Sequence, residues 1–347
     1  MFIDTPMNDR VTWLIPILNG MPYLPETLAS IEAQTYKDWE VLVWDNGSTD
    51  GTLEELDKWI PSRLPGKVFT GEPYGVGGSL KRLVEECNTE FCARIDADDV
   101  NFPDRLEKQI AFLKENPEVA FVGSQQQYID DKNNFQEYDY FIPENHDDIV
   151  HIMLSSNCIC HPSVLFRKSA VLKVGNYRDL KNVEDYDLWL RLASHFKLAN
   201  LNQKLIYYRV HPLSTTQAAI RENRIFDLAH KCLAENAPTL YGCTADEAQL
   251  LCSHSHPLAI QTLLKISKYL EKEQGGNFLT RLGSESFIKS SKRLVSSEDV
   301  ITRFVLVLLA LHKIDSYYEM IAIMKTILKK GYKKINKYIN SHSPKIM

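Results

Sequence analysis

Three carboxylates crowd together in one short stretch of the chain, Asp96-Ala97-Asp98-Asp99. The apolar residues before them, Phe91-Cys92-Ala93, are typical of a buried strand, and Asn101-Phe102-Pro103 ends that strand. Carboxylates at the end of a strand repel one another unless a cation binds there, and their oxygen atoms suit Mg²⁺ or Mn²⁺. Such ions usually bind one or two carboxylates together with substrate phosphates. The alternative is a solvated acidic turn in which Asp98 or Asp99 caps the next helix.

Two other groups of polar residues could take part in such chemistry. Glu184-Asp185-Tyr186-Asp187 stands before the apolar residues 188–192, where we expect a helix to begin. Acidic residues in the first turn of a helix interact favourably with its dipole, so a capping cluster explains this group equally well. His211 ends a predicted strand, Ile206–His211, and a lone histidine there is more often structural than a metal ligand.

A glycine-rich stretch, Gly75-Val76-Gly77-Gly78-Ser79-Leu80, also deserves a functional interpretation. Gly75 and Gly77 fit the first two positions of a dinucleotide-binding fingerprint, but Leu80 stands where its third glycine belongs, so we expect no nicotinamide cofactor. A glycine loop that opens a helix can still bring a diphosphate or ribose close to backbone amides. On this stretch alone, a simple tight turn is about equally good.

Short apolar runs alternate with stretches of helical periodicity through the part of the chain that contains these residues. This alternation is typical of an α/β domain with a mainly parallel sheet, in which ligands bind beyond the carboxyl ends of the strands. Past residue 215 the predicted strands stop, so we expect an α/β domain over residues 1–215 and a helical region over 216–347. The predicted strands are Val11–Ile17, Trp39–Trp44, Val68–Phe69, Phe91–Ile95, Val119–Gly123, Val164–Phe166 and Ile206–His211, and the predicted helices are Leu24–Gln34, Thr52–Trp59, Ser79–Cys87, Asp104–Glu115 and one that begins near Leu188.

The composition is ordinary for a globular protein, with 347 residues of which 44% are hydrophobic and 24% are charged. The formal net charge of −5 argues against nucleic acid as the main partner. Seven cysteines without framework spacing indicate a reducing compartment, so we expect a cytoplasmic protein. Residues 1–10 are polar, which predicts no secretory signal, and the apolar run Phe304–Leu311 is too short to span a bilayer. We predict no zinc site at Cys158-x-Cys160 or around Cys252, His254 and His256.

Taken together, these stretches resemble the inverting, metal-dependent nucleotide-sugar glycosyltransferases of family 2, which have the GT-A fold. The resemblance covers roughly residues 10–215 and rests on the order and spacing of several motifs, none of which is decisive alone. It implies a Rossmann-like, mainly parallel sheet with flanking helices. The matching pieces are Pro16-Ile17-Leu18-Asn19, residues 30–36, Val43 to Thr52, Ala93 to Asp99, Pro103 to Glu107, Glu184 to Asp187 and Tyr208 to His211.

For the donor nucleotide, the resemblance implies that Asp45 accepts from the pyrimidine N3–H, which uracil and thymine share. It implies that Pro16 and Asn19 line the nucleoside pocket. Gly75 and Arg94 complete the residues that we expect to contact the nucleotide sugar. Two departures from the family pattern lie in this region: Leu18 stands where an aromatic residue is common, and Asn46 replaces a common second aspartate.

For the chemical step, the resemblance implies that Asp98 and His211 bind a divalent metal, Mn²⁺ or Mg²⁺. Asp96 would bind the ribose, or the metal through a water, and Asp99 would lie near the donor sugar. Asp185 would be the general base that takes the proton from the acceptor hydroxyl. A metal site and a separate carboxylate are the minimum set for inverting sugar transfer, because the leaving diphosphate must be neutralised and the acceptor alcohol must lose its proton.

Two alternatives remain open. The first is a binding or scaffold protein built on an inactive transferase, which would be expected to lose Asp98, Asp185 or His211. The second is a nucleotidyltransferase that makes the sugar nucleotide, although such enzymes favour a basic, glycine-rich loop near the N-terminus. We expect a glycan or lipid-linked glycan as acceptor, in cell-surface polysaccharide or glycolipid synthesis, but the sequence does not identify the sugar or the linkage.

The last residues of the chain, 320–347, are free of acidic residues and have helical periodicity. A basic face opposite an apolar one suits a helix lying on an anionic membrane surface, at the inner face of the cell membrane. The alternative is a helix that packs its apolar face on the protein. The basic face would carry Lys325, Lys329, Lys330, Lys333, Lys334 and Lys337, and the apolar face Met320, Met324, Ile327, Leu328, Gly331, Ile335 and Tyr338.

Overall fold

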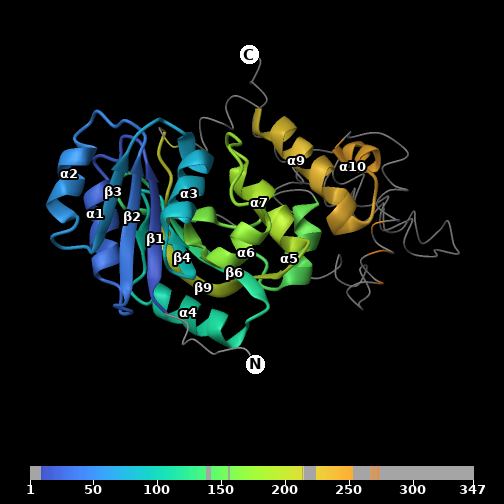
Figure 1. Ribbon diagram of the computed structural model, residues 1–347, viewed down its shortest axis with the longest axis horizontal. Helices are drawn as coiled ribbons and strands as arrows, with labels where there is room; N and C mark the ends of the chain where they lie inside the picture. The colour runs from blue at the N-terminus through green and yellow to red at the C-terminus, as the bar shows by residue number, and fades with distance from the viewer. Residues whose placement is uncertain are drawn as a thin grey trace, which may run out of the picture.

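The chain is built around one nine-stranded sheet with helices on both of its faces (Figure 1). A computed structural model describes residues 9–137, 142–154, 157–212, 214, 224–252, 266, 269 and 272. The central strands consist of apolar and β-branched residues that are buried on both sides, as strands covered by helices must be. The strands are β1 (Val11–Ile17), β2 (Trp39–Asp45), β3 (Gly66–Thr70), β4 (Phe91–Arg94), β5 (Val100–Asn101), β6 (Val119–Ile129), β7 (Phe135–Gln136), β8 (Leu165–Arg167) and β9 (Lys197–Arg209).

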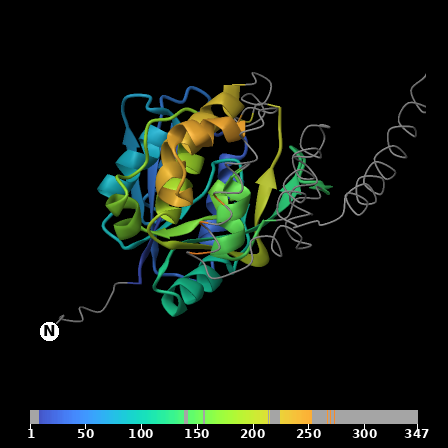
Figure 2. The same cartoon turned by 90° about the vertical axis from the view of Figure 1, so that its right-hand side faces the viewer.

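The strand order places the carboxyl ends of the N-terminal strands at one edge of the sheet. The order is β3-β2-β1-β4-β8-β6-β9-β5, and β7 pairs with β6. The first four strands of this order are parallel, which confirms the predicted parallel sheet for the N-terminal part. Strands β5, β7 and β8 run antiparallel to their neighbours, while β6 and β9 are parallel to each other. The β6–β7 hairpin, in green, projects from the side of the molecule (Figure 2).

The helices cover the two faces of the sheet, and each buries an apolar stripe in one of two core clusters. One cluster lies under α1, α2 and α4, and the other under α3, α5 and α7. The helices are α1 (Leu24–Glu32), α2 (Thr52–Trp59), α3 (Gly75–Glu86), α4 (Arg105–Glu115), α5 (His146–Met153), the 3₁₀ turn η1 (His161–Ser163), α6 (Lys168–Lys173), α7 (Glu184–Ala193), α9 (Arg224–Tyr241) and α10 (Ala245–Cys252).

Helix α3 begins four residues earlier than the sequence predicted, at Gly75 rather than Ser79, so its glycines lie in the first turn of the helix and not in a loop. The reason is close packing against α7. A Cβ atom on Gly77 would lie 2.9 Å from the Cβ of Glu184 and 2.8 Å from the carbonyl oxygen of Arg178. Only a residue without a side chain allows this approach, and it brings α3 directly against the start of α7.

The described part of the C-terminal region packs on the α/β domain. Helix α9 contacts α7, and Cys232, Leu233 and Tyr241 are buried in the same apolar cluster as α7 (Figure 1). Asp187 of α7 accepts hydrogen bonds from Arg178, which also forms an ion pair with Glu235 of α9. The division at residue 215 stays a prediction. Among the described helices, none combines the length and the apolar character needed to cross a bilayer. The basic stretch 320–347 and the run 304–311 lie outside the described residues.

Candidate active site

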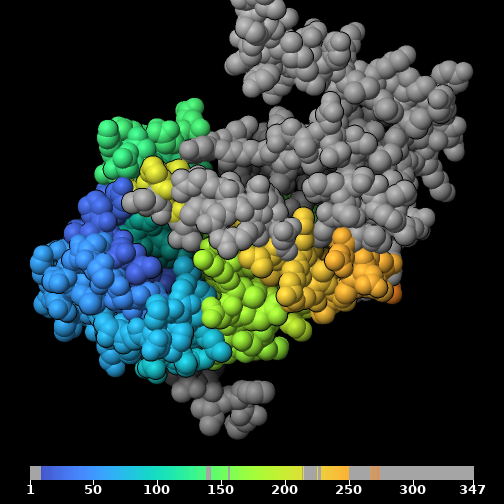
Figure 3. Space-filling model, turned by 90° about the horizontal axis from the view of Figure 1, so that it is seen from above, coloured from blue at the N-terminus to red at the C-terminus, as the bar shows by residue number. Residues whose placement is uncertain are grey.

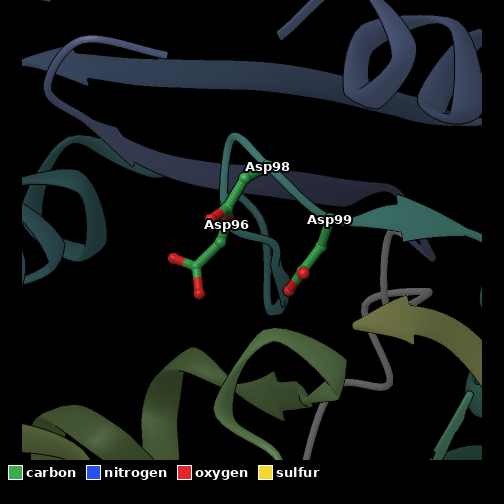
Figure 4. Close-up of side chains that lie close together, drawn as sticks. All are labelled: Asp96, Asp98 and Asp99. Atoms are coloured by element: carbon green, nitrogen blue, oxygen red, sulfur yellow. The ribbon is translucent and has the colours of Figure 1, made fainter. Parts of the chain in front are cut away.

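The turn that follows β4 carries the three carboxylates, and their side chains point to the same side of the turn (Figure 4). One oxygen from each of Asp96, Asp98 and Asp99 lies within 4.8 Å of the others. Both oxygens of Asp96 accept hydrogen bonds from the buried guanidinium of Arg94, with one of the two distances 2.6 Å. Arg94 therefore neutralises the charge of Asp96 from within the protein. The carboxylates of Asp98 and Asp99 need other partners.

Asp98 meets His211, although one stands after β4 and the other after β9. The Oδ2 atom of Asp98 lies 2.9 Å from Nε2 of His211, and the histidine ring packs against Tyr23. Arg209 fixes this meeting point, because its Nε donates to the carbonyl oxygen of Asp98 and its guanidinium binds Glu26. The structure thus brings together the two side chains that the sequence assigned to a metal.

Asp99 is buried close to Asp98, and only one of its two carboxylate oxygens has a hydrogen-bond partner. Its Oδ1 accepts from the backbone N–H of Arg209 at 2.8 Å, whereas its Oδ2 is buried without a hydrogen-bond partner. Burial raises the pKa of Asp99 well above its ordinary value, and the charges of Asp98 and Asp96 add to that rise. A buried carboxylate oxygen without a partner is costly, and a nearby cation would remove that cost.

The donor set therefore fits a divalent cation. Asp96, Asp98 and Asp99 offer clustered carboxylate oxygens, and His211 adds an imidazole nitrogen beside Asp98. Mn²⁺ accepts both kinds of ligand, and Mg²⁺ accepts the oxygens. The local charge also fits, because Arg94 offsets only one of the three carboxylates. Within the part of the chain that the structure describes, Asp96, Asp98 and Asp99 form the acidic cluster with metal-binding spacing.

Asp185, the predicted base, stands in the first turn of α7 on the other side of Arg94. Burial raises the pKa of Asp185, while hydrogen bonds from the backbone N–H of Tyr186 and from the Asn157 side chain and the positive charge of Arg94 lower it. The pKa of the neighbouring Glu184 is raised to about 8, chiefly by burial and also by the charge of Asp185. Arg94 thus lies between the acidic turn and the start of α7 and favours the ionised form of the carboxyl groups on each side.

The residues predicted for the nucleoside lie at the ends of β1 and β2. Pro16 is buried within β1, opposite Trp44 of β2. Asn19 has a left-handed backbone with φ of 54°, and its side chain accepts from the backbone N–H of Thr49, so it ties the loops after β1 and β2 together. Leu18 is 58% exposed beside this junction, where a nucleobase would be in reach of an apolar side chain.

Asp45 and Asn46 organise the same edge. The carboxylate of the buried Asp45 accepts from the backbone N–H groups of Gly47 at 3.0 Å and Ser48 at 3.1 Å. Asn46 accepts from the backbone N–H of Gly75 and from the Ser79 hydroxyl, which links the end of β2 to the start of α3. The substitution of asparagine for the common aspartate therefore keeps an acceptor that α3 uses, and the Gly75 amide is engaged by the protein itself.

Three residues of the site were missed by the sequence reasoning. Arg209 was noted within the matching piece Tyr208 to His211 but was given no role, although its side chain reaches the Asp98 turn. Asn157 donates to Asp185 at 2.7 Å, and His161 lies 4.0 Å from the same carboxylate. None of them stands in a charged or glycine-rich run, so only the fold reveals their role.

Figure 3 looks onto the edge of the sheet that carries the site. The N-terminal segments, in blue and cyan, and the α7 region, in lime, flank a hollow there.

Comparisons with known proteins agree with this arrangement. The sequence matches the model of "Glycosyl transferase family 2" over residues 12–175. The O-antigen biosynthesis glycosyltransferase WbnJ of Escherichia coli is 31% identical over 217 residues, which cover 61% of this chain and 84% of that protein. The amylovoran biosynthesis glycosyltransferase AmsE of Erwinia amylovora is 32% identical over 189 residues, which cover 54% of this chain and 70% of that protein.

Two solved structures share the fold. S. aureus TarS 1-349 in complex with UDP-GlcNAc aligns with a TM-score of 0.54 and 16% identity, over 86% of this chain and 90% of that chain. The mannosyltransferase PcManGT of Pyrobaculum calidifontis, in complex with GDP-Man and Mn²⁺, aligns with a TM-score of 0.53 and 16% identity, over 87% of this chain and 85% of that chain. The predicted GT-A fold is confirmed, and the chain belongs to glycosyl transferase family 2.

Proposed function

We propose that the protein transfers a sugar from a nucleoside-diphosphate sugar to an acceptor hydroxyl, with inversion at the anomeric carbon. The observation that supports this most is the convergence of Asp98 and His211 at 2.9 Å, with Asp185 beyond Arg94 in the same site. A metal-binding pair and a separate carboxylate are what a displacement at a sugar phosphate requires. A binding protein would have no need to keep both.

The cation site of the proposal consists of Asp98 and His211, with Asp99 close to Asp98. Asp96 is held by Arg94, so it would contribute to the cation through a water or bind the donor ribose instead. A divalent cation bound here would neutralise the diphosphate that leaves the sugar, which is the Lewis-acid contribution such ions make. The Arg209 guanidinium keeps the Asp98 turn in place while the donor enters.

Asp185 is the base of the proposal. A positioned carboxylate that removes the proton from an attacking hydroxyl typically contributes about 10²–10⁴-fold in rate. Because one base assists one in-line attack on the face opposite the leaving diphosphate, the anomeric configuration inverts. Arg94 and the hydrogen bond from Asn157 favour the ionised form of Asp185 that this role needs.

In this proposal the donor is a UDP- or dTDP-sugar, so its base is a pyrimidine. Asp45 lies at the carboxyl end of β2 with a carboxylate that would accept from N3–H, which uracil and thymine share and guanine presents differently. The exposed Leu18 offers the base an apolar surface beside it. The UDP-GlcNAc complex of TarS supports this choice, and the GDP-Man complex of PcManGT makes a guanine nucleotide the necessary control.

The acceptor of the proposal is a growing cell-surface polysaccharide or glycolipid. The support is that relatives of this chain are named for O-antigen and amylovoran biosynthesis. A lipid-linked acceptor would be met at the cytoplasmic face of a membrane, where the basic stretch 320–347 would bind anionic lipid. Co-sedimentation with anionic vesicles tests this: binding should weaken with salt, and a chain ending at Tyr317 should lose it. Equal binding by both chains would refute the membrane role.

The decisive experiment is a panel of UDP-, dTDP- and GDP-sugars, in which release of the nucleoside diphosphate is measured with Mn²⁺ and with excess chelator. We expect release from a UDP- or dTDP-sugar with Mn²⁺ only. Thermal stabilisation by the same nucleotides measures binding separately, because a ligand that binds the folded state raises its apparent stability. Stabilisation without turnover, with acceptor extracts present, would indicate an inactive transferase-fold binding protein. Synthesis of a sugar nucleotide from a nucleoside triphosphate would indicate the nucleotidyltransferase alternative.

A further inference from the structure

Asp185 does not stand free in the site, because Asn157 holds its carboxylate. Asn157 lies in the segment between α5 and η1 and donates from its Nδ2 to Oδ2 of Asp185 at 2.7 Å. The other oxygen, Oδ1, accepts from the backbone N–H of Tyr186, also at 2.7 Å. Each oxygen of the carboxylate therefore has one donor, and the group is fixed in one orientation at the start of α7.

The direction of the Asn157 bond is determined by a second contact. Oδ1 of Asn157 accepts from the backbone N–H of Ile159 at 3.1 Å, so the amide oxygen is already engaged with a donor. The NH₂ group must then face Asp185, because a flipped amide would place two donors together at Ile159 and two acceptors together at Asp185. Asn157 acts on Asp185 only as a donor, and a donor stabilises the ionised carboxylate.

The segment that carries Asn157 is held firmly by the core. Cys158, Ile159 and Cys160 are buried directly after it. His161 then lies 4.0 Å from Oδ2 of Asp185 and has its Nε2 3.0 Å from the Tyr177 hydroxyl. Because the residues that follow Asn157 are buried, its position is fixed from that side, and its hydrogen bond restrains the Asp185 carboxylate.

The charged and titratable groups around Asp185 come from four elements. Arg94 and Asp96 face it from the end of β4, His161 from η1, and Cys232 from α9. Glu184, in the same helix, and Tyr177, between α6 and α7, also interact with its charge. Burial raises the pKa of Asp185, and Asn157 and Arg94 oppose that rise from two directions.

We propose that Asn157 is a positioning residue, which orients the Asp185 carboxylate and keeps it ready to accept a proton from the acceptor hydroxyl. The inference rests on the proposed function, because Asp185 must be the base for its orientation to affect turnover. Because its Nδ2 donates to the base, a change at Asn157 should influence kcat and its pH dependence and leave donor binding unchanged.

The test compares Asn157→Asp and Asn157→Ala with Asn145→Asp. Asn157→Asp keeps the shape and the acceptor for Ile159 but places a second carboxylate against Asp185, so the pair must share a proton near neutral pH. Asn145 is a matched control at the start of α5, since it also donates from Nδ2 to a carboxylate, Asp148, and accepts from a backbone N–H. Its substitution applies the same chemical change away from the site.

Turnover is measured with the sugar nucleotide that the panel shows to react fastest. We expect Asn157→Asp to lower kcat at least about tenfold at pH 7, with the donor KM changed less than about twofold, and the acid limb of the pH profile to move upward by about one unit or more. Asn157→Ala should move the limb in the same direction by less. Wild-type kcat in both variants, or an equal loss at every pH with a lowered Tm, would overturn the proposal.

A second measurement does not need turnover. Difference ¹³C carboxyl spectra between each protein and the same protein with Asp185→Asn identify the Asp185 signal and follow its titration. We expect Asn157→Asp and Asn157→Ala to raise the pKa of Asp185 and Asn145→Asp to leave it unchanged. An unchanged titration in both Asn157 variants refutes the proposal, whereas full turnover by Asp185→Asn refutes only the assignment of the base.

Discussion

Oδ2 of Asp98 and Nε2 of His211 lie 2.9 Å apart, although 113 residues separate them in the chain. The contact exists because β4 and β9 both end at the same edge of the sheet, and Arg209 binds the Asp98 carbonyl oxygen from β9. A carboxylate and an imidazole that converge from separate strands form a site only in the folded protein. Loss of either side chain should therefore remove the site without removing a strand.

Asp98→Asn should abolish turnover and leave the fold intact, because the neutral amide keeps the size of the side chain but loses the charge that a cation requires. Nucleoside diphosphate release and circular dichroism measure the two effects. Asp104→Asn is the matched control, since Asp104 is half-buried and forms an ion pair with Lys108. Full turnover of the wild type in excess chelator would contradict the metal site.

Asp185→Asn should lower kcat by about 10²–10⁴-fold and leave the donor dissociation constant nearly unchanged, because the base acts on the acceptor. In the wild type, burial raises the pKa of Asp185. The ionised form is the active one, so kcat/KM should fall as the pH is lowered, with a midpoint above the value of about 3.9 for a free aspartate. A parallel loss of donor affinity in Asp185→Asn would assign this residue to the donor site instead.

Asp45→Asn should raise the dissociation constant of UDP about tenfold or more, since a hydrogen bond to a charged group contributes roughly 1.5–3 kcal/mol. It should change the Tm little, because an amide oxygen can still accept from the backbone of Gly47 and Ser48. Asp45→Ala should lower the Tm as well, since both N–H groups lose their acceptor. Calorimetric titration with UDP and thermal unfolding separate the two roles. Unchanged UDP affinity in Asp45→Asn would show that another residue recognises the base.

Asp99→Asn should stabilise the protein in chelator above pH 7. Burial raises the pKa of Asp99 well above its ordinary value, so the folded state holds this proton more tightly than the unfolded chain does. Stability is then lost as the pH rises from the unfolded pKa of about 3.9 towards the folded pKa, at about 1.4 kcal/mol for each unit of the shift. Asparagine keeps the oxygen that accepts from Arg209 and carries no charge. Thermal unfolding at pH 5 and pH 8 measures the effect, and a lower Tm for Asp99→Asn at pH 8 would contradict it.

The order of the elements could be predicted from the sequence, because each central strand is an apolar run and each helix has a regular apolar stripe. Val11–Ile17 and Thr52–Trp59 have the predicted bounds. The short strands β5 and β7 have two residues each and no periodicity to detect, so only pairing with β9 and β6 defines them. The first turn of α3 was missed because glycines disfavour a helix locally, whereas packing against Glu184 requires them.

The site was predictable where chemistry is concentrated in sequence, and not where it depends on a single side chain from a distant segment. Asp98 stood out as part of an acidic run, whereas His211 was assigned to a metal only through the family resemblance. Asn157 had no such signal, because its importance comes from a contact with Asp185 across 28 residues. The Arg94–Asp96 pair was also hidden, since the sequence does not show that an arginine within a strand turns back on the carboxylate two residues later.

The hydrogen bonds of Arg209 limit how the β6–β7 hairpin can be exchanged between related proteins. Its guanidinium reaches the carbonyl oxygen of Asp130, the side chain of Asn133 and Glu26 of α1 while its Nε holds the Asp98 turn. The tip of the β6–β7 hairpin is thereby linked through Arg209 to the Asp98 turn. A hairpin transplanted from a related protein should keep this link only if the graft retains an acceptor at each of these two positions, whatever sequence it carries between them.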